Sequence, residues 1–298
     1  MTLKKILLVS GTHGNEINPV WALNQFKNHF DAIDKNIEYK YIIGNPLACE
    51  RGCRYIDNDL NRSFNLIKKN SDNIIYEINR ANFLVEKFGI NGLDPCQIAI
   101  DLHTTTANMG TSIVMYGRRK KDFCLAALLQ HKFGLPIYLH EKDKKQTGFL
   151  VEAWPCGLVI EIGSVAQNYY DPKIINKFLI IISSLREEIN KLQNNQIKLP
   201  KSLIVHIHQG SIDYPRGENG TINALIHPKR MNQDWKPIKK GDPLFIDVVG
   251  NTKTYRGEHT IWPVFIGEVA YKEKNIAMSY TKKEVINFSN QVREEFFS

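Results

Sequence analysis

The sequence predicts an α/β protein with a mixed sheet, helices on both faces of that sheet, and a smaller β-rich C-terminal domain. Up to residue 200, short apolar runs of strand character alternate with longer segments whose apolar residues recur at helical spacing. After a polar break at residues 194–200, short β-like runs are separated by Gly, Pro and Asn turns. We therefore expect two domains, residues 1–200 and residues 201–298.

Apolar periodicity and turn residues predict the helices and strands of the first domain. Strands are expected where short apolar or alternating runs occur, at residues 3–9, 37–43, 97–102, 111–116, 135–140 and 157–162. Helices are expected where apolar residues recur at near-helical spacing, at residues 20–30, 72–88, 121–133 and 172–193. Pro19 and Pro172 support the first and last helix, because proline is favoured in the first helical turn. Residues 45–65 and 141–149 are expected to be loops.

The second domain is expected to be built from short strands. The β-like runs that are bounded by turn residues lie at residues 202–208, 220–226, 243–249 and 261–270. The final stretch, residues 281–296, fits either a helix or a strand and is left open.

Composition places the chain among ordinary globular proteins. Of its 298 residues, 43% are hydrophobic and 23% are charged, which is typical of a soluble protein with a sizeable core. No run approaches the ~20 apolar residues that span a bilayer, so no membrane partner is expected. The five cysteines include no Cys-x-x-Cys pair, which favours reduced thiols and a cytoplasmic location over a disulfide framework.

The chain is basic, with a formal charge of +8 and a pI of about 9.1. Two explanations are open: a surface that binds nucleic acid, or a cleft that attracts small anionic substrates. The densest basic run, residues 118–121, is interpreted as the solvated start of a helix. We expect a small anionic partner and no nucleic acid, and a non-enzymatic nucleic-acid binder is the alternative from another class.

Three expected strands end in residues that can bind or serve a metal ion. His13 and Glu16 follow the first strand, His103 ends the strand that also carries Asp101, and Glu161 lies near the end of a third. A catalytic zinc typically takes three protein ligands, and an aspartate near a ligating histidine is a common partner of that histidine. Because ligands bind at the carboxyl ends of strands in open sheets, these residues are expected to converge, although a lone His-x-x-Glu is more often a surface pair.

The motifs as a set resemble one enzyme family. Gly-Thr-His-Gly-Asn-Glu stands at 11–16, Arg-Tyr-Ile-Asp-x-Asp-Leu-Asn-Arg at 54–62, Asp-Leu-His-x-Thr-Thr-x-Asn-Met-Gly at 101–110 and Ile-Glu-Ile-Gly at 160–163. Asp-Tyr-Pro-Arg-x-Glu-Asn-Gly follows in the second domain, at 213–220. The chain is similar over nearly its whole length to the aspartoacylase/succinylglutamate desuccinylase family, which implies a zinc-carboxypeptidase-like fold.

The resemblance implies an activity and a role for each matching residue. The activity would be zinc-dependent hydrolysis of N-acetyl-L-aspartate, or another N-acyl-L-aspartate, to a carboxylate and L-aspartate, with the second domain narrowing the entrance to the site. One Zn2+ would be held by three ligands, His13, Glu16 and His103. Glu161 would be the general base and Arg54 would polarise the scissile carbonyl. The remaining substrate contacts would come from Asn61 and Arg62, which hold the α-carboxylate, and from Tyr271.

One departure leaves the substrate open. Aspartate-specific members of the family use an arginine shortly before the general-base strand to hold the side-chain carboxylate, but residues 141–155 contain no arginine. The lysines that could substitute are Lys142, Lys144 and Lys145, and Lys274 is a candidate for the lysine that the resembling members place soon after the tyrosine. A sister acylase acting on another N-acyl amino acid or on N-succinylglutamate is therefore the nearest alternative, and whether the protein is a homo-oligomer is also open.

Another histidine pair was weighed as a second metal site. His206 and His208 share one face of an expected strand, but ordinary polar strand positions are the preferred interpretation.

Overall fold

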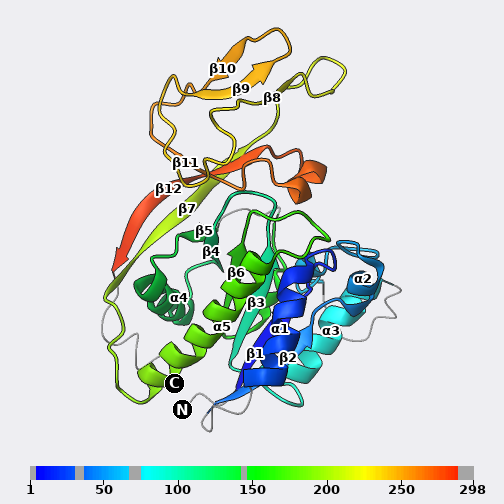
Figure 1. The fold of residues 1–298 in the computed structure, drawn as a ribbon, viewed down its shortest axis with the longest axis vertical. Coiled ribbons are helices and arrows are strands. Elements are labelled where there is room, and N and C mark those ends of the chain that lie inside the picture. The colour runs from blue at the N-terminus through cyan, green and yellow to red at the C-terminus, as the bar shows by residue number, and fades with distance from the viewer. Residues whose placement is uncertain (1–4, 31–36, 67–74, 142–145, 288–298) are drawn as a thin grey trace.

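The protein is built around a nine-stranded mixed sheet (Figure 1). The computed structural model describes residues 5–30, 37–66, 75–141 and 146–287. In spatial order the strands are β11 (Trp262–Val264), β12 (Met278–Asn287), β7 (Ser202–Ile212), β5 (Ile137–His140), β4 (Thr111–Tyr116), β6 (Cys156–Ile162), β3 (Ile98–Thr104), β1 (Lys5–Ser10) and β2 (Glu38–Ile43). The strands β2, β1, β3 and β6 run parallel, and β4 pairs with β6 in the antiparallel sense.

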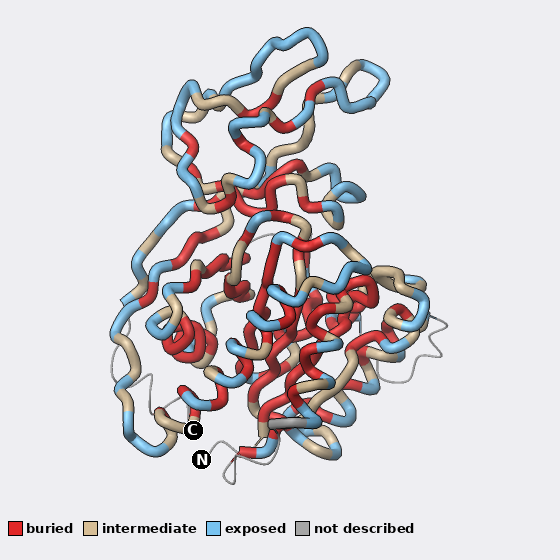
Figure 2. Tube along the Cα trace, viewed as in Figure 1, coloured by how far each residue is buried: buried red, intermediate tan, exposed pale blue. Residues whose placement is uncertain are grey.

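Helices cover both faces of this sheet, which confirms the predicted fold class. Alternate residues of β1 enter different cores, as the two-residue period of a strand requires. Ile6 and Leu8 belong to the core formed with α1 (Ile17–Phe30), α4 (Lys120–Phe133) and α5 (Pro172–Gln193). Leu7 and Val9 belong to the core formed with α3 (Tyr76–Phe88) and the 3-10 helices η2 (Leu60–Arg62) and η3 (Leu150–Ala153). The inner strands are consequently buried along most of their length (Figure 2).

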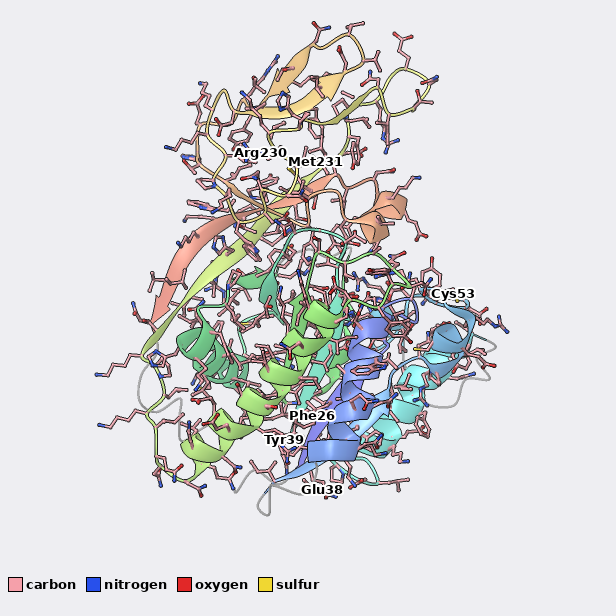
Figure 3. All side chains as sticks on the ribbon, in the orientation of Figure 1. Phe26, Glu38, Tyr39, Cys53, Arg230 and Met231 are labelled. Carbon is pink, nitrogen blue, oxygen red and sulfur yellow. The ribbon has the colours of Figure 1, made fainter. Side chains whose placement is uncertain are left out.

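An aromatic pair anchors α1 and β2 to α5 at the end of the molecule that carries the N-terminus. Phe26 and Tyr39 lie close together in Figure 3, far from Arg230 and Met231 in a turn of the C-terminal part. The buried guanidinium of Arg186 on α5 lies 5.3 Å from the Phe26 ring centre and 4.6 Å from that of Tyr39. This cation–π packing joins three elements of the first core.

The expected loop at residues 45–65 was wrong over two short segments. The α-helix α2 spans Pro46–Arg51, and η2 spans Leu60–Arg62. The Asn45 side chain caps α2 by accepting a hydrogen bond from Ala48 N over 3.1 Å, and Gly52 ends the helix at a φ of 61°. An asparagine cap, a proline in the first turn and a left-handed glycine are sufficient signals for a helix of this length.

Two expectations for the C-terminal part also change. The expected strand 261–270 is limited to β11, because the chain turns through positive φ at Phe265 and Gly267 and then forms η4 (Val269–Lys274). The open stretch 281–296 is a strand up to the end of β12, and residues 288–296 lie outside the described residues.

The C-terminal part contributes to two sheets. The strands β7, β12 and β11 extend the main sheet beyond residue 200. A separate antiparallel sheet contains β10 (Thr252–Thr254), β9 (Pro243–Asp247) and β8 (Ala224–Ile226) and has its own small core. In Figure 1 this small sheet stands beyond the ends of β7 and β12. Within the described residues, no helix is long and apolar enough to cross a membrane.

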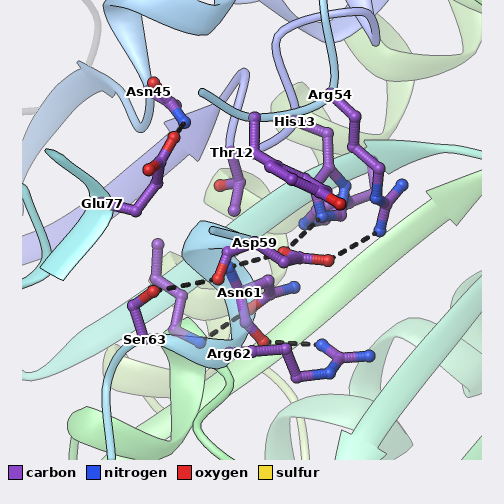
Figure 4. Close-up of polar contacts among 12 residues, drawn as sticks. Thr12, His13, Asn45, Arg54, Asp59, Asn61, Arg62, Ser63 and Glu77 are labelled. Carbon is purple, nitrogen blue, oxygen red and sulfur yellow. Dashed lines mark hydrogen bonds and ion pairs between the residues drawn. The ribbon is translucent and has the colours of Figure 1, made fainter. Parts of the chain in front are cut away.

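A buried carboxylate on α3 fixes the segment that leads to η2. Glu77 is fully buried, and its Oε1 accepts hydrogen bonds from Asn45 Nδ2 over 3.0 Å and from Ile56 N over 2.7 Å. Its Oε2 accepts from the backbone N–H groups of Asp57 and Asn58, each over 3.1 Å. Figure 4 shows Glu77 reaching Asn45 beside this segment. Glu77 thus fixes residues 56–58, which connect Arg54 to Asn61 and Arg62.

We predict that Glu77→Gln lowers the free energy of unfolding by about 2–3 kcal/mol, because an NH2 group at either oxygen position would leave the two donors that this oxygen serves without an acceptor. Urea unfolding followed by circular dichroism measures the change. Glu86→Gln, exposed on the same helix, is the matched control. Equal stability of the two variants would contradict the bracing role of Glu77.

Candidate metal centre and active site

A tight loop after β1 presents His13 and Glu16. Gly11 has a φ of 65°, and a Cβ placed on Gly14 would lie 2.0 Å from the backbone carbonyl carbon of Ala48. Only glycine allows the loop to pack this closely against α2. The loop therefore turns back over the end of the sheet, and both His13 and Glu16 are buried there.

The sheet register brings the other two predicted residues to the same place. His103 on β3 pairs with Glu161 on the adjacent β6, and β3 also pairs with β1. One ligand atom each from His13, Glu16 and His103 lies within 4.8 Å of the others. No other group of three or more potential metal-binding side chains comes this close in the part of the chain that the structure describes.

The Glu16 carboxylate lies between the two imidazoles. Its Oε1 is 2.7 Å from His13 Nδ1, and its Oε2 is 3.0 Å from His103 Nδ1 and accepts from Thr104 N over 2.8 Å. Burial raises the pKa of Glu16, but His103 and His13 outweigh burial and bring it below its usual range. Burial lowers the pKa of His103, but Asp101 and Glu16 outweigh it and raise that pKa well above normal.

Two aspartates hold the opposite nitrogens of the imidazoles. Asp101 Oδ2 is 2.7 Å from His103 Nε2, and its Oδ1 accepts from Thr12 Oγ1 over 2.7 Å. Asp59 Oδ1 is 3.0 Å from His13 Nε2, and its Oδ2 accepts from Arg54 Nη2 over 3.2 Å (Figure 4). Both rings therefore direct Nδ1 at the Glu16 carboxylate. Two imidazoles that are each held by an aspartate, together with the Glu16 carboxylate as the third ligand, fit the donor set of a zinc site.

The residues expected to bind substrate line one pocket with this group. All eight predicted site residues contribute to its wall: His13, Glu16, Arg54, Asn61, Arg62, His103, Glu161 and Tyr271. The pocket contains about 590 Å³ of space, including its open mouth. Asn61 is fixed because its Oδ1 accepts from Leu150 N over 2.7 Å and its N–H donates to Asp59 Oδ1 over 2.9 Å.

Burial changes the acidity of Glu161. The side chain is 8% exposed, and burial raises its pKa well above the usual range of a carboxylic acid. The nearby His103 opposes this shift, whereas Glu16 and Glu268 add to it. Glu161 is therefore a stronger base than an exposed glutamate.

Several pocket residues could not be found from the sequence. The aromatic part of the wall is formed by Tyr116, Tyr138, His140, Phe149 and Phe265. Tyr116 and Phe149 stack with their ring centres 3.6 Å apart, although they come from distant parts of the chain. The contact between Asp59 and His13 joins residues 46 positions apart, and no local motif announces it.

Glu268 connects the C-terminal part to the loop that follows His103. Its Oε2 accepts from the hydroxyl of Thr105 and from the N–H groups of Thr106, over 2.9 Å, and Ala107, over 3.2 Å. Tyr271 lies three residues further along η4. The contact places this turn of the C-terminal part against the pocket.

The remaining candidates from the sequence are a group of lysines and the two histidines of β7. Lys142, Lys144 and Lys145 lie outside the described residues, whereas Lys274 Nζ donates to Gln146 Oε1 over 3.3 Å. The histidines of β7 contact other side chains: His208 Nδ1 is 2.8 Å from Tyr138 Oη, and His206 Nδ1 is 3.3 Å from Thr281 Oγ1.

The chain is similar to known proteins along its full length. The succinylglutamate desuccinylase/aspartoacylase catalytic domain matches residues 2–189, and the AstE/AspA barrel-sandwich hybrid domain matches residues 201–283. A protein of Prochlorococcus marinus subsp. pastoris described as a probable aspartoacylase is 82% identical, with 100% of each chain covered. Another so described, from Prochlorococcus marinus strain NATL1A, is 48% identical over 97% of this chain and 96% of the relative.

Solved structures share the fold. Murine aminoacylase 3 aligns with a TM-score of 0.86 and 28% identity over 96% of this chain and 97% of that chain. Succinylglutamate desuccinylase from Chromobacterium violaceum aligns with a TM-score of 0.61 and 16% identity over 95% and 85% of the two chains, a likeness of fold alone.

Fold and comparisons together define an α/β protein of the zinc-carboxypeptidase-like type, with a β-rich C-terminal part. The chain belongs to the succinylglutamate desuccinylase/aspartoacylase family of hydrolases, which confirms the resemblance found in its motifs.

We predict that Asp101→Asn weakens Zn2+ binding at this group about 10–100-fold, because a neutral amide is a weaker acceptor for His103 Nε2–H than the carboxylate and makes the imidazole less basic. Competition with a chromophoric chelator measures the affinity. Asp94→Asn, which changes a surface ion pair with Lys5 and Lys40, is the control. Unchanged zinc affinity in the Asp101 variant would show that this aspartate does not orient His103.

Proposed function

We propose that the protein is a zinc-dependent amidohydrolase that deacetylates N-acetyl-L-aspartate, releasing acetate and L-aspartate. The observation that carries this proposal is the convergence of the His13, Glu16 and His103 donors with Glu161 in a single pocket. The description of the relatives as probable aspartoacylases supports the choice of substrate.

His13, Glu16 and His103 would hold one Zn2+, since their donor types and mutual distances fit such an ion. A zinc ion bound there would supply Lewis acidity, which lowers the pKa of a water molecule so that it can lose a proton near neutral pH and attack the amide. Asp59 and Asp101 would keep the two imidazoles in the orientation that the ion requires.

Glu161 would transfer the proton in the reaction. Its carboxylate takes a proton from the attacking water and delivers it to the amine nitrogen as the carbon–nitrogen bond breaks. The raised pKa of this buried group suits both steps, because a stronger base accepts the proton more readily near neutral pH. Its position on β6, opposite His103, supports this role.

The cationic part of the pocket would bind and polarise the substrate. Arg54 would stabilise the charge that develops on the acyl oxygen, an interaction that typically contributes about 3 kcal/mol to transition-state binding. Asn61 and Arg62 would hold the α-carboxylate, and Tyr271 would donate a hydrogen bond from the C-terminal part. Residues of the segment 265–271 line the pocket, and this segment would narrow the entrance and exclude long peptides.

Two alternative functions predict different experimental results. A sister acylase would prefer another N-acyl amino acid or N-succinylglutamate, and kcat/KM values across a panel of acyl amino acids separate these substrates. A nucleic-acid binder would retain DNA in a salt-sensitive way and would need no metal.

We predict that Glu161→Gln keeps its zinc and loses nearly all turnover, because an amide of the same shape cannot accept the proton. Metal analysis and an acetyl-aspartate assay on the same preparation measure both properties. Glu187→Gln, on the exposed side of α5, should behave as the unsubstituted protein. Near-normal activity of the Glu161 variant would overturn the assignment of the base.

Metal removal provides an independent prediction. Dialysis against a chelator should abolish hydrolysis, and stoichiometric Zn2+ should restore it. Because an ion that binds only the folded state stabilises that state by about 4 kcal/mol at a thousand times its Kd, the Tm should also fall on removal and recover with zinc. Full activity in dialysed protein that contains no transition metal would exclude the proposed chemistry.

A further inference from the structure

Gln146 lies where two cationic side chains meet at the wall of the pocket. Arg62 Nη2 donates to the Gln146 amide oxygen over 3.0 Å, and Lys274 Nζ donates to the same oxygen over 3.3 Å. Gln146 is 9% exposed and lines the pocket together with Arg62. One neutral oxygen therefore holds two positive charges side by side, although they come from η2 and η4.

The guanidinium of Arg62 is fixed in position, with one N–H group left without an acceptor among the described residues. Its Cζ lies 4.0 Å from the centre of the Phe149 ring, and its Nη1 donates to the Asn61 carbonyl over 2.6 Å. Its Nε is buried and has no acceptor among the described residues. In the proposed function the α-carboxylate would take Nε, which leaves Nη2 and Lys274 Nζ as the donors for a second carboxylate.

An amide oxygen and a carboxylate oxygen accept hydrogen bonds in similar geometry, but a carboxylate also brings a full negative charge opposite the two cations. A carboxylate on the side chain of the substrate therefore displaces Gln146 from Arg62 and Lys274. A neutral side chain gains nothing comparable and leaves the bridge between Arg62 and Lys274 intact.

We propose that Gln146 determines the selectivity of the site for an acidic side chain on the substrate. The proposal rests on the proposed hydrolysis of N-acyl amino acids and deepens it. Gln146 keeps Arg62 and Lys274 together in the ligand-free protein, and the second carboxylate of the substrate takes the place of its amide oxygen. This arrangement would supply a cationic contact in place of the arginine that is absent from residues 141–155.

The test compares two substrates that differ only in side-chain charge, N-acetyl-L-aspartate and N-acetyl-L-alanine. Gln146→Glu places a fixed carboxylate at the point where the substrate carboxylate would bind. The ratio of kcat/KM for the aspartate to that for the alanine substrate should fall about tenfold or more, through KM, because like charges then face each other. Both substrates carry the α-carboxylate, so a general effect on Arg62 cancels in this ratio.

Asn65→Asp is the matched control. Asn65 is exposed, and its Nδ2 donates to the Thr147 hydroxyl over 2.8 Å, so the variant makes the same change of charge beside Gln146 but outside the pocket wall. Its ratio should stay close to that of the unsubstituted protein. A folded, zinc-loaded Gln146→Glu variant with an unchanged ratio overturns the proposal.

Two further measurements keep the outcome decisive. If Gln146→Glu does not fold, Lys274→Met replaces it: a lowered ratio supports the proposal and an unchanged ratio overturns it. Calorimetric titration of both ligands into zinc-loaded Glu161→Gln protein, with and without Gln146→Glu, measures binding without turnover. If the unsubstituted protein hydrolyses neither compound but Gln146→Glu selectively weakens acetyl-aspartate binding, the proposed function fails and the subsite stands.

Discussion

The buried carboxylate of Glu16 is the constraint on which the site depends. A buried carboxylate without partners is strongly destabilising, so the surrounding structure has to supply donors in fixed positions. Here the donors are His13 from the same loop, His103 from a different strand and the N–H of Thr104. Satisfying this one group requires the ends of β1 and β3 to stay in register.

The next layer of contacts extends that constraint through the protein. Asp101 is fixed within β3 by its own strand and by Thr12, whereas Asp59 belongs to the segment that Glu77 braces. The orientation of His13 therefore depends on a helix, α3, whose side chains do not line the pocket. Two arginines of the pocket wall share this support, because Arg54 donates to Asp59 and Arg62 ends the 3-10 helix that Asp59 caps.

The sequence was most informative where chemistry coincided with a strand end. His13, Glu16, His103 and Glu161 could be predicted as a group because each follows or ends an apolar run, and parallel strands bring such ends together. Arg54, Asn61, Arg62 and Tyr271 depended on the family motifs. The stacking of Tyr116 on Phe149, the bridge through Gln146 and the contact of Asp59 with His13 could not be predicted, because each depends on packing between distant segments that leaves no local pattern.

The way β7 joins the main sheet has a consequence for dissecting the chain. Tyr138 and Leu139 of β5 pair in parallel with His206 and Ile207 of β7, which in turn pairs along its whole length with β12. Cutting the polypeptide near residue 200 would turn β5 into a bare edge with unsatisfied backbone groups, a template for intermolecular sheet growth. We therefore expect the N-terminal two-thirds to form insoluble aggregates when it is expressed alone.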